Sequence, residues 1–320
     1  MRNKSFLWWA AYLSLLIIFT AYVALDTFVI PKVYAVYEEE SAEEETENAG
    51  DTAAVSAGNT DEEKNSEAGD EEEREAAATV TDTSYEDENI SVTVTTLRKY
   101  DTDIYIADIV ISSPKYLKTA LAKGLFGKNV TETVSAMAED NGAVIAVNGD
   151  FYGARSGGYV IRNGVLLRDT AVKGQEDLVI YHDGSFEIIC EDDVTGEELL
   201  DKGAVQVLSF GPGLIEDGEI SVDADDEVGK AMASNPRTAV GMIDSLHYVF
   251  IVSDGRTDKS SGLTLMELAE VMESLGCVSA YNLDGGGSST MVFMGEVVNN
   301  PTTGGSRIKE RSVSDIVYIG

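Results

Sequence analysis

The sequence predicts an α+β domain of mixed β-sheets with packed helices, preceded by one transmembrane helix and a disordered acidic linker. Three observations predict it: a charge-free run of twenty residues near the N-terminus, an acidic stretch with few large apolar side chains, and a C-terminal part where short β-prone runs alternate with turn signals and helical segments. We expect residues 1–37 to form a cytoplasmic stub and transmembrane anchor, residues 38–88 the linker, and residues 89–320 one folded domain.

The first element is the apolar run over residues 6–25, which at about 1.5 Å per residue can cross a bilayer core of about 30 Å. Arg2 and Lys4 precede this run and Asp26 follows it, so the positive-inside rule places the N-terminus in the cytoplasm. We expect a single-pass protein of the cell membrane with an extracytoplasmic domain. The alternative is a signal peptide cleaved near Ala35, which would release a secreted protein.

The second element is the acidic stretch over residues 38–88. It holds 21 Asp and Glu residues against Lys64 and Arg74, a net charge of −19 out of −34 for the whole chain. Few large apolar side chains are present to offset the entropy of ordering, so the stretch is expected to be a disordered spacer with a span of roughly 40 Å. The acidic balance also excludes nucleic acid as a partner, because phosphate backbones are bound by clustered Lys and Arg.

The first half of the domain is expected to be largely antiparallel β-structure. Asn-Gly at 163–164 and Asp-Gly at 183–184 are typical of tight two-residue hairpin turns. We expect strands at 90–97 and 104–111, a helix at 131–140, a buried strand at 143–147, and hairpins at 159–167 and 178–189.

The second half contains the clearest helix, which begins with a capping box of Thr264 and Glu267 and ends at Gly276. Strands are expected around it at 237–243, 246–253, 278–283 and 288–294. Strand, helix and strand in this order favour parallel strands whose carboxyl ends share one edge of the sheet. Asp254 and Asp284 would then lie at the same edge.

A weaker form of the same argument applies to Asn148 and Asp150, which follow the strand at 143–147. Asp150, Asp254 and Asp284 are therefore the candidates for proton transfer, since glycosidic cleavage uses a pair of carboxylates. His182 and His247 both fall inside expected strands, which disfavours a Ser-His-Asp triad or a histidine metal site.

Three glycines follow Asp284, and such a run is tolerated where the backbone takes positive φ or lets a ligand approach. Arg237 and Arg311 precede strands and could hold a phosphate with paired hydrogen bonds. The only cysteines, Cys190 and Cys277, are either free thiols or one disulfide. The sequence requires no cofactor and leaves the metal ligands unknown, with a divalent cation as an open alternative.

Several motifs resemble those of the phosphodiester glycosidase family. They run in order as NPRTAVG, SDGR, SGLTLMELAE and YNLDGGGSSTMV between residues 235 and 292, and NGDFYG, GYVIRNG and the terminal RSVSDIVYI add weaker support. The resemblance covers most of residues 140–320. It implies hydrolysis of a sugar-1-phosphate diester at the anomeric side, which releases the sugar and leaves a phosphomonoester.

The resemblance also implies a set of site residues at the matching positions. They are Asn148, Arg237, Asp254, Gly255, Asp284, Gly285, Gly286, Gly287, Ser288 and Arg311. Of these, Asp284 and Asp254, together with Asp150, are expected to be catalytic, and the others to bind substrate. Asp150 stands where the family often has a second glycine, so this carboxylate could alter substrate choice or bind a cation.

We therefore expect an extracytoplasmic hydrolase of sugar-1-phosphodiester linkages in a cell-surface glycopolymer, such as an exopolysaccharide or another cell-envelope polymer. Two alternatives from other classes remain open. One is a non-catalytic glycan-binding or envelope-organising protein, because a fold alone does not establish activity. The other is an esterase or phosphodiesterase with Ser288 as nucleophile. Oligomeric state is left open by the sequence.

Overall fold

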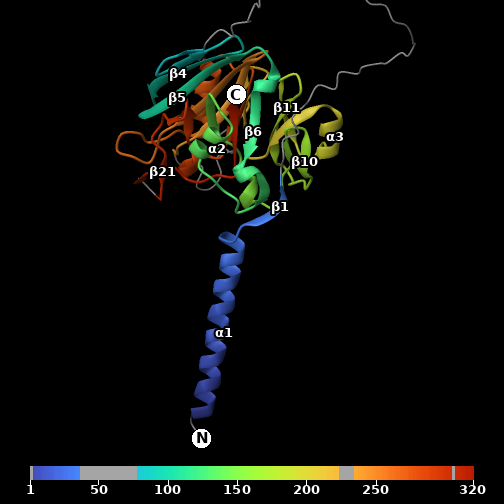
Figure 1. The fold of residues 1–320 in the computed structure, drawn as a ribbon, viewed down its shortest axis with the longest axis vertical. Coiled ribbons are helices and arrows are strands. Elements are labelled where there is room, and N and C mark those ends of the chain that lie inside the picture. Colours follow the sequence, from blue (N-terminus) through green and yellow to red (C-terminus); the bar gives the residue numbers. More distant parts are fainter. Residues whose placement is uncertain (1–2, 37–77, 223–233, 305–306) are drawn as a thin grey trace, which may run out of the picture.

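The structure is a computed structural model that describes residues 3–36, 78–222, 234–304 and 307–320. A single long helix, α1 (Asn3–Phe28), stands away from a domain made mainly of β-sheets (Figure 1). Most of the expected acidic linker, residues 38–77, lies outside the described residues. The last part of that stretch is described and already belongs to the domain, as two short strands before residue 89.

The largest sheet has nine strands in the order β15-β14-β18-β16-β17-β5-β4-β3-β2. In chain order these strands are β2 (Thr79–Val80), β3 (Ser84–Glu86), β4 (Ile90–Lys99), β5 (Thr102–Ile111), β14 (Gly213–Glu216), β15 (Glu219–Ile220), β16 (Thr238–Asp244), β17 (His247–Ser253) and β18 (Ser279–Leu283).

Two five-stranded sheets accompany it, with the orders β10-β9-β13-β11-β12 and β20-β19-β8-β23-β6. The first contains β9 (Val160–Arg162), β10 (Val165–Arg168), β11 (Glu176–Tyr181), β12 (Phe186–Cys190) and β13 (Ala204–Leu208). The second contains β6 (Leu117–Leu121), β8 (Ile145–Asn148), β19 (Met291–Phe293), β20 (Glu296–Val297) and β23 (Asp315–Ile319). Two-stranded pairs are formed by β1 (Lys32–Val36) with β7 (Leu125–Lys128), and by β21 (Thr302–Thr303) with β22 (Arg307–Ile308).

Besides α1, the described helices are short, with α2 over Val134–Asp140, α3 over Gly196–Asp201 and α4 over Leu265–Ser274. The predicted capping box is present at the start of α4, where Thr264 accepts from the backbone N–H of Glu267 and the Glu267 carboxylate accepts in return. Single 3₁₀ turns occur at Pro114–Tyr116, Ala122–Gly124, Tyr152–Ala154 and Gly286–Ser288.

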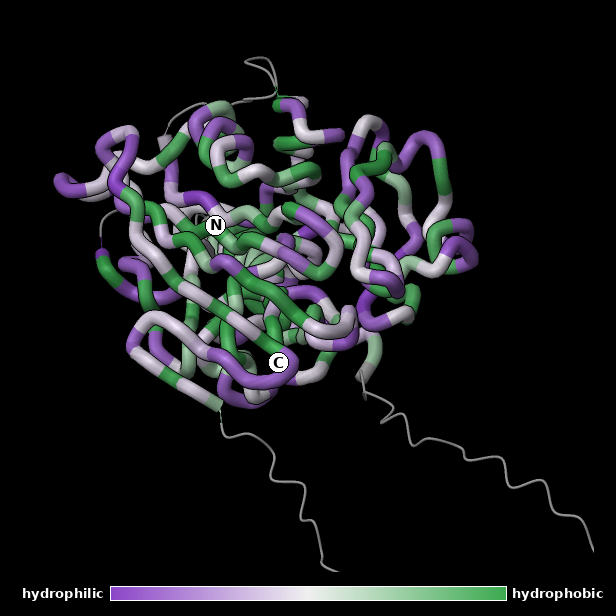
Figure 2. Tube along the Cα trace, turned by 90° about the horizontal axis from the view of Figure 1, so that it is seen from above, coloured by the Kyte–Doolittle hydropathy of each residue, from purple (hydrophilic) through white to green (hydrophobic). Residues whose placement is uncertain are grey.

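The central strands of the nine-stranded sheet contribute buried side chains to both faces, because successive side chains of a strand point to opposite faces and both faces are covered there. On one face Ile109, Phe250 and Tyr281 pack against residues of both five-stranded sheets. On the other face Ile251 and Ala280 pack against the apolar side of α4. Along the chain, hydrophobic residues gather in the interior and hydrophilic ones occupy the outer loops (Figure 2). The molecule is therefore layered, with the large sheet in the middle.

The α+β class is confirmed by this arrangement. Every strand pairing among the described residues joins antiparallel neighbours, and parallel directions arise between strands that a third strand separates. The expected helix at 131–140 begins only at Val134, because Thr133 is its N-cap. The expected strand at 288–294 is shortened by the 3₁₀ turn before it. Cys190 and Cys277 are both free thiols.

Helix α1 carries the apolar span that the sequence predicts. Its segment Trp8–Phe28 is long and apolar enough to cross a membrane, a test that a signal sequence near the N-terminus also passes. The side chains described in this segment are largely exposed, as expected for a helix that packs against lipid rather than against a protein core.

Candidate active site

One edge of the nine-stranded sheet brings together three of the predicted site residues. β16 lies between β17 and β18 and is antiparallel to both, so β17 and β18 run in the same direction. Asp254 follows the end of β17, Asp284 follows the end of β18, and Arg237 precedes the start of β16. The shared edge confirms the expected strand direction. β16, however, separates the ends of β17 and β18 by two strand spacings, about 10 Å.

Asn148 reaches this edge from the second five-stranded sheet. It ends β8, and its side chain is fully buried. The amide nitrogen donates to the backbone carbonyl of Asp284 at 2.7 Å, while the amide oxygen accepts from the Thr238 hydroxyl at 2.8 Å. With its amide engaged on both sides, Asn148 is a positioning residue that fixes the backbone of Asp284.

The Asp284 carboxylate is held by two side chains. It accepts from Nη2 of Arg311 at 2.7 Å and from the Ser288 hydroxyl, which Arg311 also contacts. Burial raises the pKa of Asp284 above its ordinary value, and nearby Asp150 adds to this; Arg311, Ser288 and the N–H of Gly285 pull it down without cancelling the rise. The result is a carboxylate that is more basic than usual.

The glycine run allows other groups to approach the backbone after Asp284. Gly286 has φ +62°, and a Cβ there would lie 2.9 Å from Nη2 of Arg256. A Cβ on Gly285 would lie 2.9 Å from the carbonyl oxygen of Pro236. Both contacts are closer than real Cβ atoms tolerate without displacement of a neighbour, so the run lets Arg256 and the segment before β16 pack against this turn.

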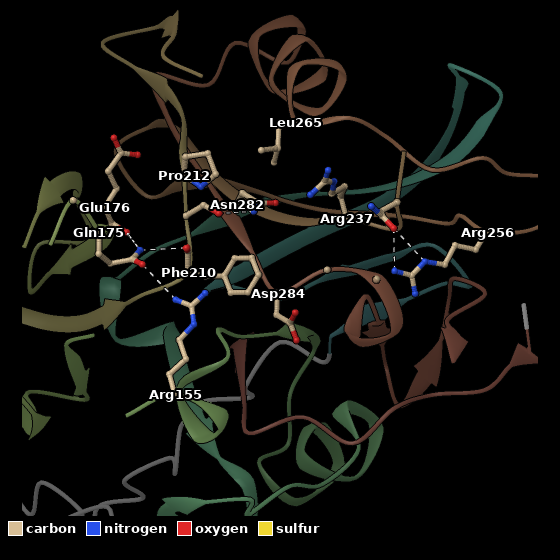
Figure 3. A pocket seen from close by; sticks show the side chains of 15 residues that line it. Arg155, Gln175, Glu176, Phe210, Pro212, Arg237, Arg256, Leu265, Asn282 and Asp284 are labelled. Carbon is tan, nitrogen blue, oxygen red and sulfur yellow. Dashed lines mark hydrogen bonds between the residues drawn. The ribbon is translucent and has the colours of Figure 1, made fainter. Parts of the chain in front are cut away.

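A pocket of about 510 Å³ opens at this edge (Figure 3). Asp284 lies near its centre, between a wall that comes from the start of β16 and the loop after β17 and a wall that comes from the first five-stranded sheet and its loops. The lining consists of Arg155, Gly174, Gln175, Glu176, Phe210, Gly211, Pro212, Asn235, Arg237, Arg256, Leu265, Asn282, Asp284, Gly285 and Gly286.

Three arginines line the pocket, although the chain as a whole is strongly acidic. Arg237 is nearly buried and donates through Nε to the carbonyl of Leu263 at 3.0 Å. Arg256 donates through Nε and Nη2 to the side-chain oxygen of Asn235, at 3.2 and 2.9 Å. These bonds fix two guanidinium groups on one side of Asp284, where they favour an anionic ligand.

The third arginine stands on the opposite wall. Arg155 lies 5.1 Å from the centre of the Phe210 ring and donates to the Gln175 side chain at 3.4 Å and to the carbonyl of Ser209 at 3.3 Å. Figure 3 places Arg155 and Arg256 at opposite ends of the pocket, with Phe210 and Asp284 between them. The pocket therefore offers a cation at each end and an aromatic ring in the middle.

Asp254 is placed differently from the expectation that it works together with Asp284. It is buried and does not line the pocket. Its oxygens accept from the backbone and side-chain nitrogens of Asn300, each at 2.8 Å, and from the Tyr105 hydroxyl at 3.3 Å. The neighbouring Gly255 accepts from the Thr302 hydroxyl at 3.2 Å. These contacts make Asp254 and Gly255 an anchor for the loop that follows β20.

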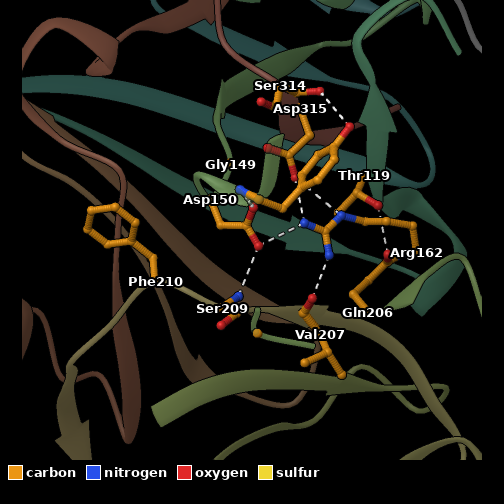
Figure 4. Close-up of polar contacts among 12 residues, drawn as sticks. Thr119, Gly149, Asp150, Arg162, Gln206, Val207, Ser209, Phe210, Ser314 and Asp315 are labelled. Carbon is orange, nitrogen blue, oxygen red and sulfur yellow. Dashed lines mark hydrogen bonds and ion pairs between the residues drawn. The ribbon is translucent and has the colours of Figure 1, made fainter. Parts of the chain in front are cut away.

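Asp150 is also turned away from the pocket, into a buried cluster around Arg162 (Figure 4). Its carboxylate accepts from Nη2 of Arg162 at 2.9 Å and from the backbone N–H groups of Tyr152 and Ser209. Asp315 binds the same Nη2 at 2.6 Å. Burial raises the pKa of Asp315, and repulsion from Asp150 adds to it, because one guanidinium faces two carboxyl groups.

The remaining predicted residues fall close to the pocket or beside it. Gly285 and Gly286 line the pocket, and Gly287 packs near Thr302. The side chains of Ser288 and Arg311 contact the carboxylate of Asp284. Nine lining side chains are absent from the set predicted from the sequence: Arg155, Gln175, Glu176, Phe210, Pro212, Asn235, Arg256, Leu265 and Asn282. Within the described residues, no group of three or more His, Cys, Asp or Glu side chains is arranged to hold a metal ion.

Comparison with known proteins gives matches over this same region. The model of the phosphodiester glycosidase family matches residues 141–320, which is more than half of the chain and contains the whole pocket lining. The SPbeta prophage-derived uncharacterized protein YomE of Bacillus subtilis is 33% identical over 201 residues, 61% of this chain and 30% of that protein. The N-acetylglucosamine-1-phosphodiester alpha-N-acetylglucosaminidase of Mus musculus is 32% identical over 191 residues, 53% of this chain and 35% of the enzyme.

These matched segments span about a third of the relatives' own lengths. Among solved structures, the catalytic domain of the zebrafish N-acetylglucosamine-1-phosphodiester alpha-N-acetylglucosaminidase, auto-inhibited by its pro-peptide, has a TM-score of 0.57 at 21% identity and covers 72% of this chain and 82% of that chain. A hypothetical protein from Synechocystis has a TM-score of 0.53 at 14% identity, with 73% and 62% covered. Both structures share the fold. The chain belongs to the phosphodiester glycosidase family.

Proposed function

We propose that the protein hydrolyses the bond between the anomeric carbon of a sugar and a phosphodiester oxygen, in a glycopolymer outside the cell membrane. The observation that carries this proposal is the placement of Asp284. It is a largely but not fully buried carboxylate with a raised pKa, near the centre of a pocket that arginines line and within the segment that matches the family.

The phosphate is proposed to bind between Arg237 and Arg256. Both guanidinium groups are fixed by hydrogen bonds before any ligand arrives, and preorganised cations are the usual way to stabilise charge on a departing phosphate. Arg311 serves a different purpose. Because it binds the Asp284 carboxylate and Ser288, it orients the carboxylate instead of facing the phosphate.

Asp284 then takes one of two roles. It activates, as a base, a water molecule that attacks the anomeric carbon, or it attacks this carbon itself as the nucleophile. The bond from this carbon to oxygen breaks, its electron pair leaves with the phosphomonoester, and water supplies the hydroxyl of the released sugar. A phosphomonoester is a far better leaving group than a sugar alkoxide, since its second pKa is about 6. One carboxylate in the pocket is therefore enough, and Asp254 need not protonate the leaving group.

The wall formed by Arg155 and Phe210 is proposed to bind the organic part of the substrate. An aromatic ring such as Phe210 offers an apolar face to the C–H groups of a sugar, and Arg155 packs over the same ring. At the other end of the pocket from Arg256, Arg155 is placed to meet a further phosphate of a polymeric substrate. These roles extend the expected site beyond the residues of the motifs.

We also propose that α1 remains as a membrane anchor and that the domain is extracytoplasmic. The apolar span Trp8–Phe28 and the basic residues before it support this orientation. Such a position suits a cell-surface polymer with phosphodiester-linked sugars.

The proposed function is tested with the full-length protein in detergent. The substrates are a methyl diester of N-acetylglucosamine-1-phosphate, which the names of the mammalian relatives point to, and methyl N-acetylglucosaminide as the matched glycoside without phosphate. We expect release of sugar from the diester alone. Asp284→Asn is expected to abolish the release, and Asp258→Asn, which changes an exposed carboxylate of the loop after β17, is the matched control that keeps it.

Two outcomes would count against the proposal. Saturable binding of sugar-1-phosphate diesters without turnover, for several sugars and with or without divalent cations, would favour the glycan-binding protein. Loss of activity in Ser288→Ala together with a covalent adduct on Ser288 would favour the serine esterase. The structure gives the serine mechanism little support, because Ser288 contacts Asp284 and Arg311, and the one described histidine ion pair, His247 with Asp108, is exposed.

A further inference from the structure

The strand β1 connects the membrane helix to the domain much more tightly than a flexible linker would. It begins four residues after the end of α1 and pairs with β7, in the register Lys32 to Lys128 through Val36 to Leu125. In Figure 1 the end of α1 passes directly into β1 at the base of the domain. Chain geometry limits the distance between the Cα atoms of Phe28 and Lys32 to about 14 Å.

Further contacts fix the junction itself. The side-chain amide of Asn129, just after β7, donates to the carbonyls of Thr27 and Ile30 at 3.2 and 3.3 Å. Lys32 forms an ion pair with Asp26 at 2.7 Å. Asn129 thus binds the last turn of α1 and the turn after it to the domain, so the helix end is held as well as the strand.

The domain is shaped to receive β1. A Cβ on Gly127 would lie 2.2 Å from the carbonyl oxygen of Lys32, so only glycine permits the pairing. Tyr34 of β1 packs with its ring 5.9 Å from Phe126, and Phe126 stacks on the buried Tyr152 at 5.4 Å. The contact therefore reaches the residues around the buried Arg162 cluster, since the Arg162 guanidinium lies 5.7 Å from the Tyr152 ring.

The surface of the junction fits a lipid boundary. Large apolar side chains are exposed on both sides of Pro31, at Phe28, Val29 and Ile30 before it and at Val33 and Tyr34 after it. At a membrane interface the same side chains enter the headgroup region, where aromatic residues are enriched.

The acidic stretch has both ends on the domain. The chain leaves at Val36, on the strand that pairs with β7, and is next described at residue 78, just before β2 at the edge of the nine-stranded sheet. Because β1 already pairs with β7 of the domain, only residues 29–31 lie between the end of α1 and the first strand attached to the domain.

We propose that β1 docks the domain directly onto the bilayer surface, with the chain's own anchor as the occupant of the β7 edge. The height of the domain is then set by the residues between α1 and β1. A domain of about 240 residues is roughly 45 Å across. Resting on the proposed function, this places the reacting linkage within about 60 Å of the membrane, so the substrate is a membrane-proximal or lipid-attached glycan phosphate.

The test uses the full-length protein in lipid vesicles and measures the height of the domain by energy transfer from a dye at Val110→Cys to dyes in the lipid, in a background of Cys190→Ser and Cys277→Ala. Val110 is exposed on β5, in a sheet to which neither β1 nor β7 belongs. Deletion of residues 45–70 is expected to leave the energy transfer unchanged. Gly127→Ala, which blocks β7, and Ala35→Pro, which interrupts β1 without changing the domain, are both expected to lower it.

A disulfide provides the second measurement. Residues 36 and 125 are Cα partners in the strand pair, so Val36→Cys with Leu125→Cys is expected to cross-link at least about tenfold faster than Val36→Cys with Val110→Cys. The proposal is overturned if the deletion raises energy transfer while Ala35→Pro has no effect, or if N-terminal sequencing shows that β1 is removed in the mature protein. Neither measurement depends on catalysis, so a failure of the proposed function would leave these results intact.

Discussion

The pocket edge and the buried cluster around Arg162 are both built from aspartate and arginine side chains, and they differ in how far these side chains are exposed to solvent. At the pocket, the side chains of Asp284 and Arg311 keep 13% and 39% of their exposure. In the cluster, Arg162 keeps 1%, and Asp150 and Asp315 keep none. Both regions hold a carboxyl group whose burial raises its pKa, Asp284 in the first and Asp315 in the second.

The difference shows that a raised pKa does not by itself mark a catalytic group. Asp150 is saturated by Arg162 and by two backbone N–H groups, so it offers nothing to a ligand. Asp284 is held by the side chains of Ser288 and Arg311, and it lines a pocket that a substrate can fill. Changes at the pocket edge should therefore alter activity, and changes in the Arg162 cluster should alter stability.

The largest effect is expected from Asp284→Asn, whose kcat should fall by at least about 10²-fold, because a positioned acid–base group contributes that much or more. Its stability should not fall. The folded state binds a proton at Asp284 more tightly than the unfolded state, so ionisation of this group costs stability as pH rises, and asparagine removes that cost. Thermal unfolding at pH 8 checks this, and a large drop in melting temperature would contradict the assignment.

Arg162→Met should have the opposite signature. It leaves Asp150 and Asp315 buried without their cation, which is expected to cost about 3–5 kcal/mol of unfolding free energy. The loss should be smaller at pH 5 than at pH 8, because burial raises the pKa of Asp315, and once protonated this carboxyl group no longer needs the guanidinium. Denaturant unfolding at the two pH values provides the measurement. A stable Arg162→Met protein with normal unfolding but reduced kcat would refute the structural role of this cluster.

A third effect concerns phosphate recognition. Arg256→Ala should lower kcat/KM by about 10- to 100-fold, the value of one or two hydrogen bonds to a charged group. Arg256→Lys should recover only part of this loss, because lysine cannot keep both bonds to Asn235. Steady-state kinetics on the diester decide the matter, with inhibition by inorganic phosphate as a second readout. Unchanged inhibition in Arg256→Ala would remove this residue from the phosphate site.

Asp177 extends the comparison to a buried carboxyl group that faces Glu191 and has no arginine like Arg162 bound to it in the described structure. Burial, followed by repulsion from Glu191, raises the pKa of Asp177 to about 10. The folded state therefore holds this proton between about pH 4 and pH 10, and stability declines as pH rises through that range. Asp177→Asn should stabilise the protein at pH 8 by roughly 1–3 kcal/mol and have little effect near pH 4. Equal effects at both pH values would contradict this.

The smallest effect is expected from Asp254→Asn. The sequence predicts that Asp254 is catalytic, whereas in the structure it does not line the pocket. Asn300 donates both a backbone and a side-chain N–H to this carboxylate, and asparagine can accept only with its oxygen. We expect a loss of about 1 kcal/mol in stability and a change in kcat of less than about threefold. A kcat as low as that of Asp284→Asn would show that Asp254 reaches the substrate after all.

The sequence predicted those features that depend on local patterns. Capping residues located α4, the strand directions placed Asp254 and Asp284 at one edge, and the glycine run identified the turn after β18. It could not show that β16 inserts between β17 and β18, because this pairing is decided by packing across the sheet. The separation of the two aspartates follows from that insertion alone.

The missed pocket residues have a similar explanation. Arg155, Glu176 and Phe210 come from the loops and strands of a different sheet, and no local pattern shows that this sheet closes over Asp284. Arg256 could have been predicted from the sequence, since it is the last residue of the SDGR motif, but an arginine in a loop is usually solvated. The pairing of β1 with β7 joins segments about ninety residues apart, so no local pattern predicts it. Gly127 is the residue that the pairing requires to be glycine.

The central claim is that the bond to the anomeric carbon breaks, and hydrolysis of the sugar-1-phosphate diester in ¹⁸O-labelled water tests it most directly. If Asp284 directs water or its own oxygen to the sugar, the label appears in the released sugar and the phosphomonoester stays unlabelled. The stereochemistry of the first-formed sugar then separates the two roles of Asp284, retention indicating a nucleophile and inversion a base. Label in the phosphate would mean attack at phosphorus and would contradict the account.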